Sequence, residues 1–408
     1  MYPSIMQVTP GGILLRLRAA IAALALLALA GVARAAAVPV PPHLSARSWL
    51  VQDLRTGRVI ARSRAGREME PGSLAKLMTL YVVLRHVRSG TLGLHSRVRI
   101  SREVWRMHGS QMFLKAGSRV PVIQLIRGMI VDGANDAAVA LADGVSGSQQ
   151  AFVDRMNRQA RVLGMGHTHY VNASGLPAAG MRTTASDTAV LARALIRRFP
   201  KFYHFFGRRS FRFDDITQHN RNRLLWRDHH VDGLITGDDG PGRYHLVASS
   251  RRDGERMIAV VLGTPRAGDR FDDARSLLHY AFHYYRTRRL YRPGKPVARK
   301  KVWEGAGRSV AVAVPRPVWV TYPRGDYRQL RVALKLPRDV IAPVDKGERL
   351  GKLSVSLDND TLARVPVVAA GRVPEGDLWR RWHDAAWLAV TRHLREWFPK
   401  LTRAIASN

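Results

Sequence analysis

The sequence predicts an α/β fold in three parts: a mixed domain of strands and helices, a small all-β domain, and a C-terminal amphipathic helix. Three observations lead to this prediction. Strand patterns flank a long, mainly helical middle, short alternating strands dominate from about residue 292 onward, and the last segment has apolar residues at helical spacing.

The mixed domain is expected to begin with a hairpin and a helix. Residues 47–64 have strand patterns on both sides of the turn Thr56-Gly57. Apolar residues then recur at helical spacing over residues 71–87, and Ser89-Gly90 provides a stop signal. This segment is the clearest helix in the chain.

The rest of the mixed domain is expected to be helices followed by strands. Ser186 is the expected capping residue of the last helix of the first group. That group covers residues 122–129, 135–144, 150–163 and 186–198. Strands return on both sides of the turn Asp253-Gly254, at residues 244–249 and 256–263, and a closing helix is expected at residues 271–285.

The all-β domain is indicated by short apolar runs separated by Pro, Gly and Asp. These runs include residues 310–314, 318–322, 330–336 and 353–357. We therefore divide the chain of 408 residues into a signal peptide (1–36), the mixed domain (37–290), a small β-sandwich (291–373) and an amphipathic helix (374–408).

The signal peptide is predicted from charge followed by hydrophobicity. Arg16 and Arg18 precede an apolar run at residues 19–30, and the small-residue sequence Ala33-Arg34-Ala35-Ala36 follows, as is typical of a cleaved secretory signal. An uncleaved membrane anchor is the alternative, although a spanning helix needs about 20 apolar residues.

The amino-acid composition limits the classes of partner that the protein is expected to bind. The 66 Lys and Arg against 31 Asp and Glu give a formal charge of +35, which attracts polyanions such as lipid headgroups or cell-wall polymers. Export argues against nucleic acid as the partner. The chain has no cysteine, which excludes disulfides and thiolate chemistry.

The tail predicts a helix that lies in a membrane interface, because it pairs tryptophans on one side with arginines on the others. A helix packed on the protein is the alternative. The apolar stripe is Trp379, Trp382, Ala386, Val390, Leu394 and Trp397, and the arginines are Arg380, Arg381, Arg392 and Arg395.

Ser73 and Lys76 form the candidate reactive pair. Their spacing places them side by side on a helix, so an unprotonated lysine amine takes the serine proton during attack on a carbonyl. Pro71 suits the first helical turn, which places Ser73 near free backbone donors.

The stretch Pro71-Gly72-Ser73-Leu74-Ala75-Lys76 resembles the active-serine motif of penicillin-recognising enzymes, and most closely that of D-alanyl-D-alanine carboxypeptidases, the low-molecular-mass penicillin-binding proteins. The resemblance covers nearly the whole mature chain. It continues through Asn135-Asp136-Ala137-Ala138, Asn172-Ala173-Ser174-Gly175-Leu176, Asn220-Arg221-Asn222 and Val231-Asp232-Gly233-Leu234.

This resemblance implies a β-lactamase/DD-peptidase-like catalytic domain, with an antiparallel sheet and a helical subdomain. It also implies a periplasmic enzyme at the cytoplasmic membrane that acts on peptidoglycan stem peptides, is acylated by β-lactams, and uses no cofactor. Membrane association is then peripheral, through the C-terminal helix.

The resemblance also assigns roles. Ser73 corresponds to the nucleophile and Lys76 to its base, while Asn135 corresponds to the asparagine that holds the lysine and a substrate amide. Arg221 corresponds to an arginine that receives the terminal carboxylate. Thr236 and Gly237 end the third motif, and the backbone N–H of Asp238 corresponds to an oxyanion-hole donor. A helix cap and a surface arginine are the alternatives for Asn135 and Arg221.

Two motif positions depart from the family pattern. The second motif begins with Gly133 instead of serine, so a proton-relaying hydroxyl is missing, and the third begins with Ile235 instead of lysine, so a cation is missing. Arg182 or Arg243 is a candidate for replacing the lost charge. The same losses argue against a β-lactamase.

Histidine pairs at His167, His169, His229 and His230 lack the spacing of a metal site, so no metal is expected. Two hypotheses remain. The chain is a serine-type D-Ala-D-Ala carboxypeptidase of full or reduced activity, or it is a catalytically impaired homologue that binds peptidoglycan as a regulatory or scaffolding protein.

Overall fold

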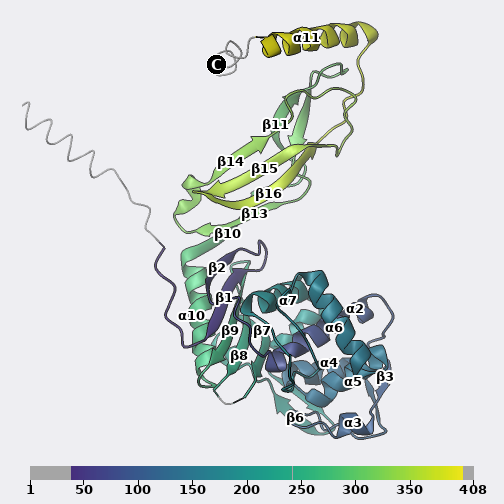
Figure 1. Ribbon diagram of the computed structural model, residues 1–408, viewed down its shortest axis with the longest axis vertical. Helices are drawn as coiled ribbons and strands as arrows, with labels where there is room; N and C mark the ends of the chain where they lie inside the picture. Colours follow the sequence, from purple (N-terminus) through teal and green to yellow (C-terminus); the bar gives the residue numbers. More distant parts are fainter. Residues whose placement is uncertain (1–37, 241, 398–408) are drawn as a thin grey trace, which may run out of the picture. The chain divides into compact units, whose positions relative to one another are not determined.

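The computed structural model describes residues 38–240 and 242–397 (Figure 1). The signal peptide predicted at residues 1–36 lies outside the described residues.

The mixed domain is built on a five-stranded antiparallel sheet with the order β2-β1-β9-β8-β7. Its strands are β1 (Ser48–Asp53), β2 (Val59–Ser63), β7 (Val231–Asp238), β8 (Tyr244–Arg252) and β9 (Glu255–Thr264). The first and last segments of the domain therefore share one sheet, and β7 lies at its edge.

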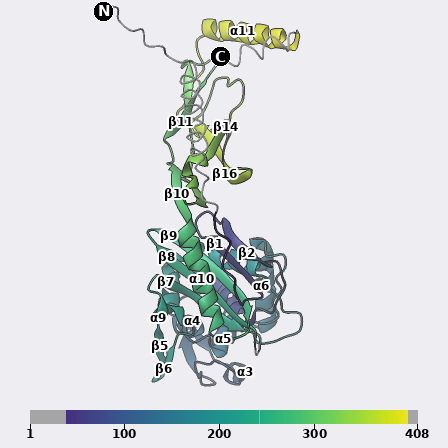
Figure 2. The same cartoon turned by 90° about the vertical axis from the view of Figure 1, so that its left-hand side faces the viewer.

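Helices cover both faces of this sheet. Helix α10 (Asp269–Tyr284) packs on β8 and β9, while α7 (Ala185–Arg198) packs on β9 and β1. Figures 1 and 2 show α10 on one side of the sheet and the helical cluster on the other. Three-layer packing buries the apolar central strands on both faces.

The helical cluster matches the expected helices closely. It comprises α2 (Ala75–Arg88), α4 (Val122–Val131), α5 (Asn135–Ser146), α6 (Gln149–Leu163) and α7. The capping prediction for Ser186 is wrong: Thr184 has an extended backbone, and its side chain accepts a hydrogen bond from the Asp187 backbone N at 3.0 Å. Ser186 already lies inside the helix.

Short elements complete the domain and were not anticipated individually. They are the hairpins β3 (Arg97–Arg99) with β4 (Arg119–Pro121) and β5 (Ser210–Phe213) with β6 (Ile216–His219), the helices α3 (Arg102–Trp105), α8 (Pro200–Tyr203) and α9 (Leu224–Arg227), and the 3-10 turns η1 (Gly72–Leu74) and η2 (His204–Gly207).

The second domain is all-β and has its own apolar core. A five-stranded sheet has the order β11-β12-β16-β15-β14, and β10 pairs with β13. The strands are β10 (Tyr285–Tyr291), β11 (Pro296–Lys301), β12 (Ser309–Ala313), β13 (Val318–Pro323), β14 (Arg331–Lys335), β15 (Arg349–Leu357) and β16 (Asp360–Ala369), with the 3-10 turn η3 (Asp326–Gln329) after β13.

Helix α11 (Leu378–Trp397) follows the all-β domain. Asp384 accepts a hydrogen bond from the Glu304 backbone N at 2.8 Å, and Leu388 is buried. Trp379 and Trp382 are exposed, whereas the side chains of Leu394 and Trp397 lie outside the described part. Within the described residues, no helix has both the length and the apolar character needed to cross a membrane.

Candidate active site

Ser73 lies in the 3-10 turn η1, immediately before α2. It was expected in the first turn of the α-helix itself. The 3-10 turn still brings residues i and i+3 together, and Ser73 is partly exposed. The serine hydroxyl is therefore reachable from solvent.

Gly72 allows the serine turn to approach the edge strand β7. Its φ is +50°, and a Cβ built on it would lie 1.9 Å from the backbone oxygen of Asp238. No residue with a side chain fits this approach. The contact holds Ser73 beside the end of β7.

Lys76 is buried, with 1% of its surface exposed. Its Nζ lies 3.0 Å from the Ser73 Oγ and donates to the Ser174 backbone oxygen at 2.5 Å. Burial lowers the pKa of Lys76 to about 7, and Arg221 adds to this effect. At neutral pH a large fraction of the amine is therefore unprotonated and able to act as a base.

Three carboxylates oppose the loss of the lysine proton. Asp238, Asp132 and Asp136 each raise the pKa of Lys76, but less than burial lowers it. Asp132 also lies 3.7 Å from the Arg221 guanidinium. The Arg221 charge is thus partly balanced at the rim of the site.

Asn135 is buried at the start of α5. Its Nδ2 donates to the His108 backbone oxygen at 2.7 Å, and its backbone N donates to Ser110 O at 2.7 Å. The hydrogen bonds described for Lys76 go to Ser73 and Ser174 instead. Asn135 therefore fixes the loop that carries Ser110 beside the serine.

The third motif lies on β7. Ile235 and Thr236 are buried, and Gly237 packs against Leu74, the residue after the serine. Ile235, Thr236 and Asp238 line the same cavity as Ser73. The free edge of this strand offers backbone groups to an extended peptide.

Gly133 lines this cavity as well. Its φ is +77°, and a Cβ at this position would lie 3.8 Å from Cδ of Arg221. There is room for a side chain, but the backbone conformation disfavours one. Arg221 occupies the space beside the position where the family has its serine.

Arg270 is a site residue that sequence reasoning missed. It lies in the first turn of α10, lines the cavity of Ser73, and donates to the backbone oxygen of Gly237 at 3.0 Å. Burial lowers the pKa of Arg270 to about 10, so the guanidinium stays charged at neutral pH. It places a cation on the wall that has lost its lysine.

The two arginines proposed as replacements are engaged elsewhere. Arg182 lies 3.6 Å from Glu68, and Arg243 lies 3.3 Å from Asp239. Neither is among the residues that line the cavity of Ser73. Arg270 escaped notice because the helix was expected to begin at residue 271, and no local pattern links it to the serine.

Asp228, His229 and His230 are the described group whose candidate ligand atoms lie within 4.8 Å of one another. Both Asp228 carboxylate oxygens already accept hydrogen bonds, from the His230 backbone N at 2.9 Å and from Arg252 at 3.1 Å. We assign no metal to this group.

The arrangement combines a reachable hydroxyl, a buried amine that loses its proton near neutral pH, a free strand edge, and two cations. Together these suit nucleophilic attack on the carbonyl of an extended peptide that ends in a carboxylate.

Comparisons with known proteins agree with this chemistry. The sequence model of the D-alanyl-D-alanine carboxypeptidase family (peptidase S11) matches residues 34–266, and that of the C-terminal domain of penicillin-binding protein 5 matches residues 285–375. The D-alanyl-D-alanine carboxypeptidase DacD of Escherichia coli (strain K12) is 35% identical over 354 residues, which is 85% of this chain and 91% of that protein.

Solved structures give the same result. Penicillin binding protein 5 from Haemophilus influenzae has a TM-score of 0.78 at 31% identity, covering 83% of this chain and 100% of that one. Penicillin-binding protein D2 from Listeria monocytogenes, in its ampicillin-bound form, has a TM-score of 0.55 at 29% identity, covering 60% and 100%. The fold is that of a penicillin-binding protein, with a catalytic α/β domain and a C-terminal all-β domain, and the chain belongs to the D-alanyl-D-alanine carboxypeptidase family.

Proposed function

We propose that this protein removes the terminal D-alanine from peptidoglycan stem peptides through an acyl-enzyme on Ser73. The observation that carries the proposal is the separation of 3.0 Å between the Ser73 Oγ and a Lys76 amine whose pKa is about 7. A buried amine of this kind is a competent general base at neutral pH.

In the first step Lys76 takes the Ser73 proton while Oγ bonds to the carbonyl carbon of the penultimate D-alanine. The tetrahedral intermediate then collapses, its C–N bond breaks, and the leaving amine receives the proton that Lys76 holds. Water attacks the ester in the second half of the reaction, which releases the shortened peptide and restores Ser73.

The replacements at Gly133 and Ile235 are expected to lower catalytic activity. Gly133 supplies no hydroxyl to relay the proton to the leaving group, so Lys76 must deliver it. Losing one such group typically lowers the rate by about 10²- to 10⁴-fold. We propose that Arg270 compensates for the other loss, since it brings a cation to the Gly237 backbone and the cavity of Ser73.

The cavity of Ser73 is lined by the cations Arg221 and Arg270, which favours recognition of a chain end that carries a carboxylate. We propose that the substrate lies along β7, with its backbone bonded to Thr236 and the oxyanion held by the N–H of Asp238. The terminal carboxylate then faces Arg221 and Arg270.

The second candidate is a peptidoglycan-binding protein with little catalysis. The replacement of serine and lysine by Gly133 and Ile235 favours it. A fluorescent penicillin and a D-Ala-D-Ala peptide distinguish the two functions. We expect covalent labelling and D-alanine release from the parent, and neither from Ser73→Ala. A parent protein that neither labels nor releases D-alanine contradicts the enzyme.

We further propose that the protein is exported and held at the periplasmic face of the cytoplasmic membrane by its tail. Trp379 and Trp382 support this, with 77% and 73% of their surfaces exposed. The division of the chain at residues 36, 290 and 373 belongs to the same proposal. Truncation after Val373 is expected to move the protein from membrane to soluble fractions. Unchanged membrane recovery would count against a role for α11.

A further inference from the structure

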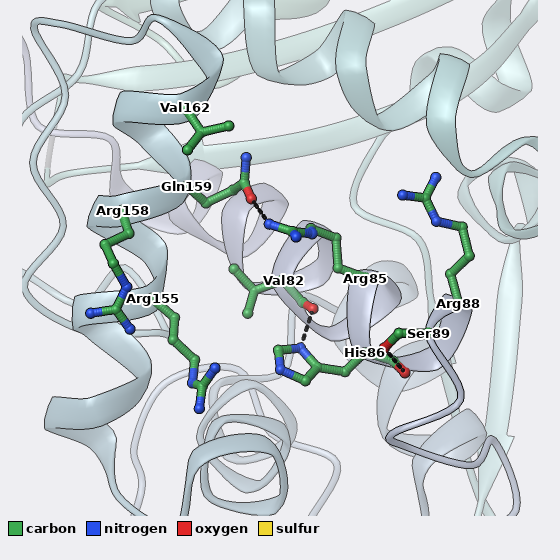
Figure 3. Close-up of a pocket in the computed structure, with 9 residues that line it drawn as sticks. All are labelled: Val82, Arg85, His86, Arg88, Ser89, Arg155, Arg158, Gln159 and Val162. Carbon is green, nitrogen blue, oxygen red and sulfur yellow. Dashed lines mark hydrogen bonds between the residues drawn. The ribbon is translucent and has the colours of Figure 1, made fainter.

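A second cavity, of about 430 Å³, lies between α2 and α6 (Figure 3). Residues three and four apart on each helix face it, as neighbours on one helix surface do. Its lining consists of Val82, Arg85, His86, Arg88 and Ser89 from α2 and the turn after it, and Arg155, Arg158, Gln159 and Val162 from α6. None of these residues lines the cavity of Ser73.

The polar lining of this arginine cavity is strongly cationic. Four of its nine residues are arginines, and none is Asp or Glu. Among the described residues, no hydrogen bond or ion pair engages the guanidinium of Arg155 or Arg158. Figure 3 shows both on α6, across from Arg85 and Arg88. All four arginines are exposed, so water screens part of their mutual repulsion, and an anion bound among them would lower it further.

Compensation of helix dipoles does not explain the set. Arg85 and Arg88 lie in the last turn of α2, where cations are favourable. Arg155 and Arg158 lie in the interior of α6, which spans Gln149–Leu163, so they gain nothing from its C-terminus.

Gln159 makes a buried polar contact between the two helices at this cavity. It is buried, with 3% of its surface exposed, and its Oε1 accepts a hydrogen bond from Arg85. Because a guanidinium only donates, this contact fixes the amide orientation and leaves Nε2 as a donor. Nε2 has no hydrogen-bond partner in the structure. Figure 3 shows the oxygen directed to Arg85 and the nitrogen on the other side of the amide.

We propose that the arginine cavity binds a phosphorylated ligand. Guanidinium groups bind phosphate oxygens with paired hydrogen bonds, and the buried Gln159 amide holds one of these groups, that of Arg85, in place. The arginine cavity has room for a ligand that carries more than one phosphate or a phosphate on an organic group. A soluble phosphorylated compound and a phospholipid headgroup share this chemistry.

Calorimetric titration of the full chain with tripolyphosphate at low salt tests the site. We expect Arg155→Gln with Arg158→Gln to weaken binding about 10- to 100-fold, because two charge-assisted contacts are lost. The matched control is Arg161→Gln with Arg197→Gln, which removes the same charge from exposed arginines outside the cavity. We expect it to weaken binding less than about threefold.

Gln159→Met separates a built site from general attraction. It keeps the net charge and the approximate volume but removes the oxygen that holds Arg85 in place, so we expect binding about 3- to 10-fold weaker. No binding of tripolyphosphate by the parent overturns the proposal, as does an equal loss in the two double variants.

Binding to vesicles of phosphatidylglycerol and phosphatidylcholine distinguishes a phospholipid headgroup from a soluble phosphorylated ligand. Comparing the parent with the Arg155 and Arg158 double variant keeps the tail constant. If the double variant binds vesicles more weakly, the headgroup is the ligand. If vesicle binding is unchanged while tripolyphosphate binding is lost, the ligand is soluble. Both outcomes are independent of catalysis at Ser73.

Discussion

The two walls of the Ser73 cleft differ in how they keep the chemistry of the family. On one wall Ser73 and Lys76 lie 3.0 Å apart, and burial sets the lysine pKa near 7. The other wall has Gly133 and Ile235 in place of serine and lysine, and Arg270 reaches it from α10. Nucleophile activation is thus a local property of one turn, whereas charge stabilisation depends on residues from several elements.

The largest effect on acylation is expected when the base Lys76 is removed. Lys76→Met removes the amine but keeps an unbranched side chain of similar length in a buried position. Acylation of Ser73 by fluorescent penicillin is expected to fall about 10²- to 10⁴-fold, because no base remains. A labelling rate within about threefold of the parent's contradicts the role of Lys76, provided that thermal unfolding shows an intact fold.

The next largest effect on acylation is expected when the cation Arg270 is removed. Arg270→Gln removes the cation but keeps a donor near the Gly237 backbone, and we expect acylation to fall about 10- to 100-fold. Arg243→Gln is the matched control, since Arg243 is engaged with Asp239 outside the cavity. Equal losses in the two variants would show that Arg270 acts only through the net charge.

A rescue experiment tests the same role of Arg270. If Arg270 replaces the missing lysine, Ile235→Lys should have little effect in the parent, where a cation is already present. In the Arg270→Gln background it should restore acylation by about tenfold. The double-mutant cycle measures this coupling. If the effects of Arg270→Gln and Ile235→Lys on the rate of penicillin labelling are additive, the two positions act independently. That result would contradict the proposal that Arg270 compensates for the missing lysine.

The smallest effect is expected from Gly133→Ala, which adds backbone strain but no reactive group. Because φ is +77°, we expect Gly133→Ala to cost about 1–2 kcal/mol and lower Tm by about 2–8 °C. Gly133→Ser carries the same strain but adds a hydroxyl, so it should acylate faster than Gly133→Ala. Identical rates for the two would show that a hydroxyl here relays no proton. Calorimetry and labelling together separate strain from chemistry.

Sequence patterns predicted the family, the fold class and most helices, because those depend on periodicity and on a contiguous motif. The proximity of Ser73 and Lys76 followed from their spacing, although the turn is 3-10. Strand β16 was not among the runs named from the sequence, and it contains Pro366, a residue that is rare inside a sheet. In the structure β12 pairs β16 only at Val368 and Ala369, so Pro366 interrupts no bond on that side.

Long-range features were beyond sequence reasoning. Arg270 meets Gly237 only because β8 and β9 return the chain to the start of α10. The arginine cavity likewise needs α2 and α6 to face each other across about 70 residues of sequence. Neither placement leaves a local signal.

The pH dependence of Ser73 acylation tests the central claim most directly. The pKa of Lys76 is lowered to about 7, so the free base that accepts the serine proton increases as pH rises through that value. The second-order rate constant for labelling by fluorescent penicillin should rise with a midpoint near pH 7, and at about pH 5.5 it should be about 30-fold below its plateau. A rate that is flat between about pH 5.5 and 9, or that reaches its midpoint only near the ordinary lysine pKa of about 10.4, contradicts a neutral Lys76 as the base.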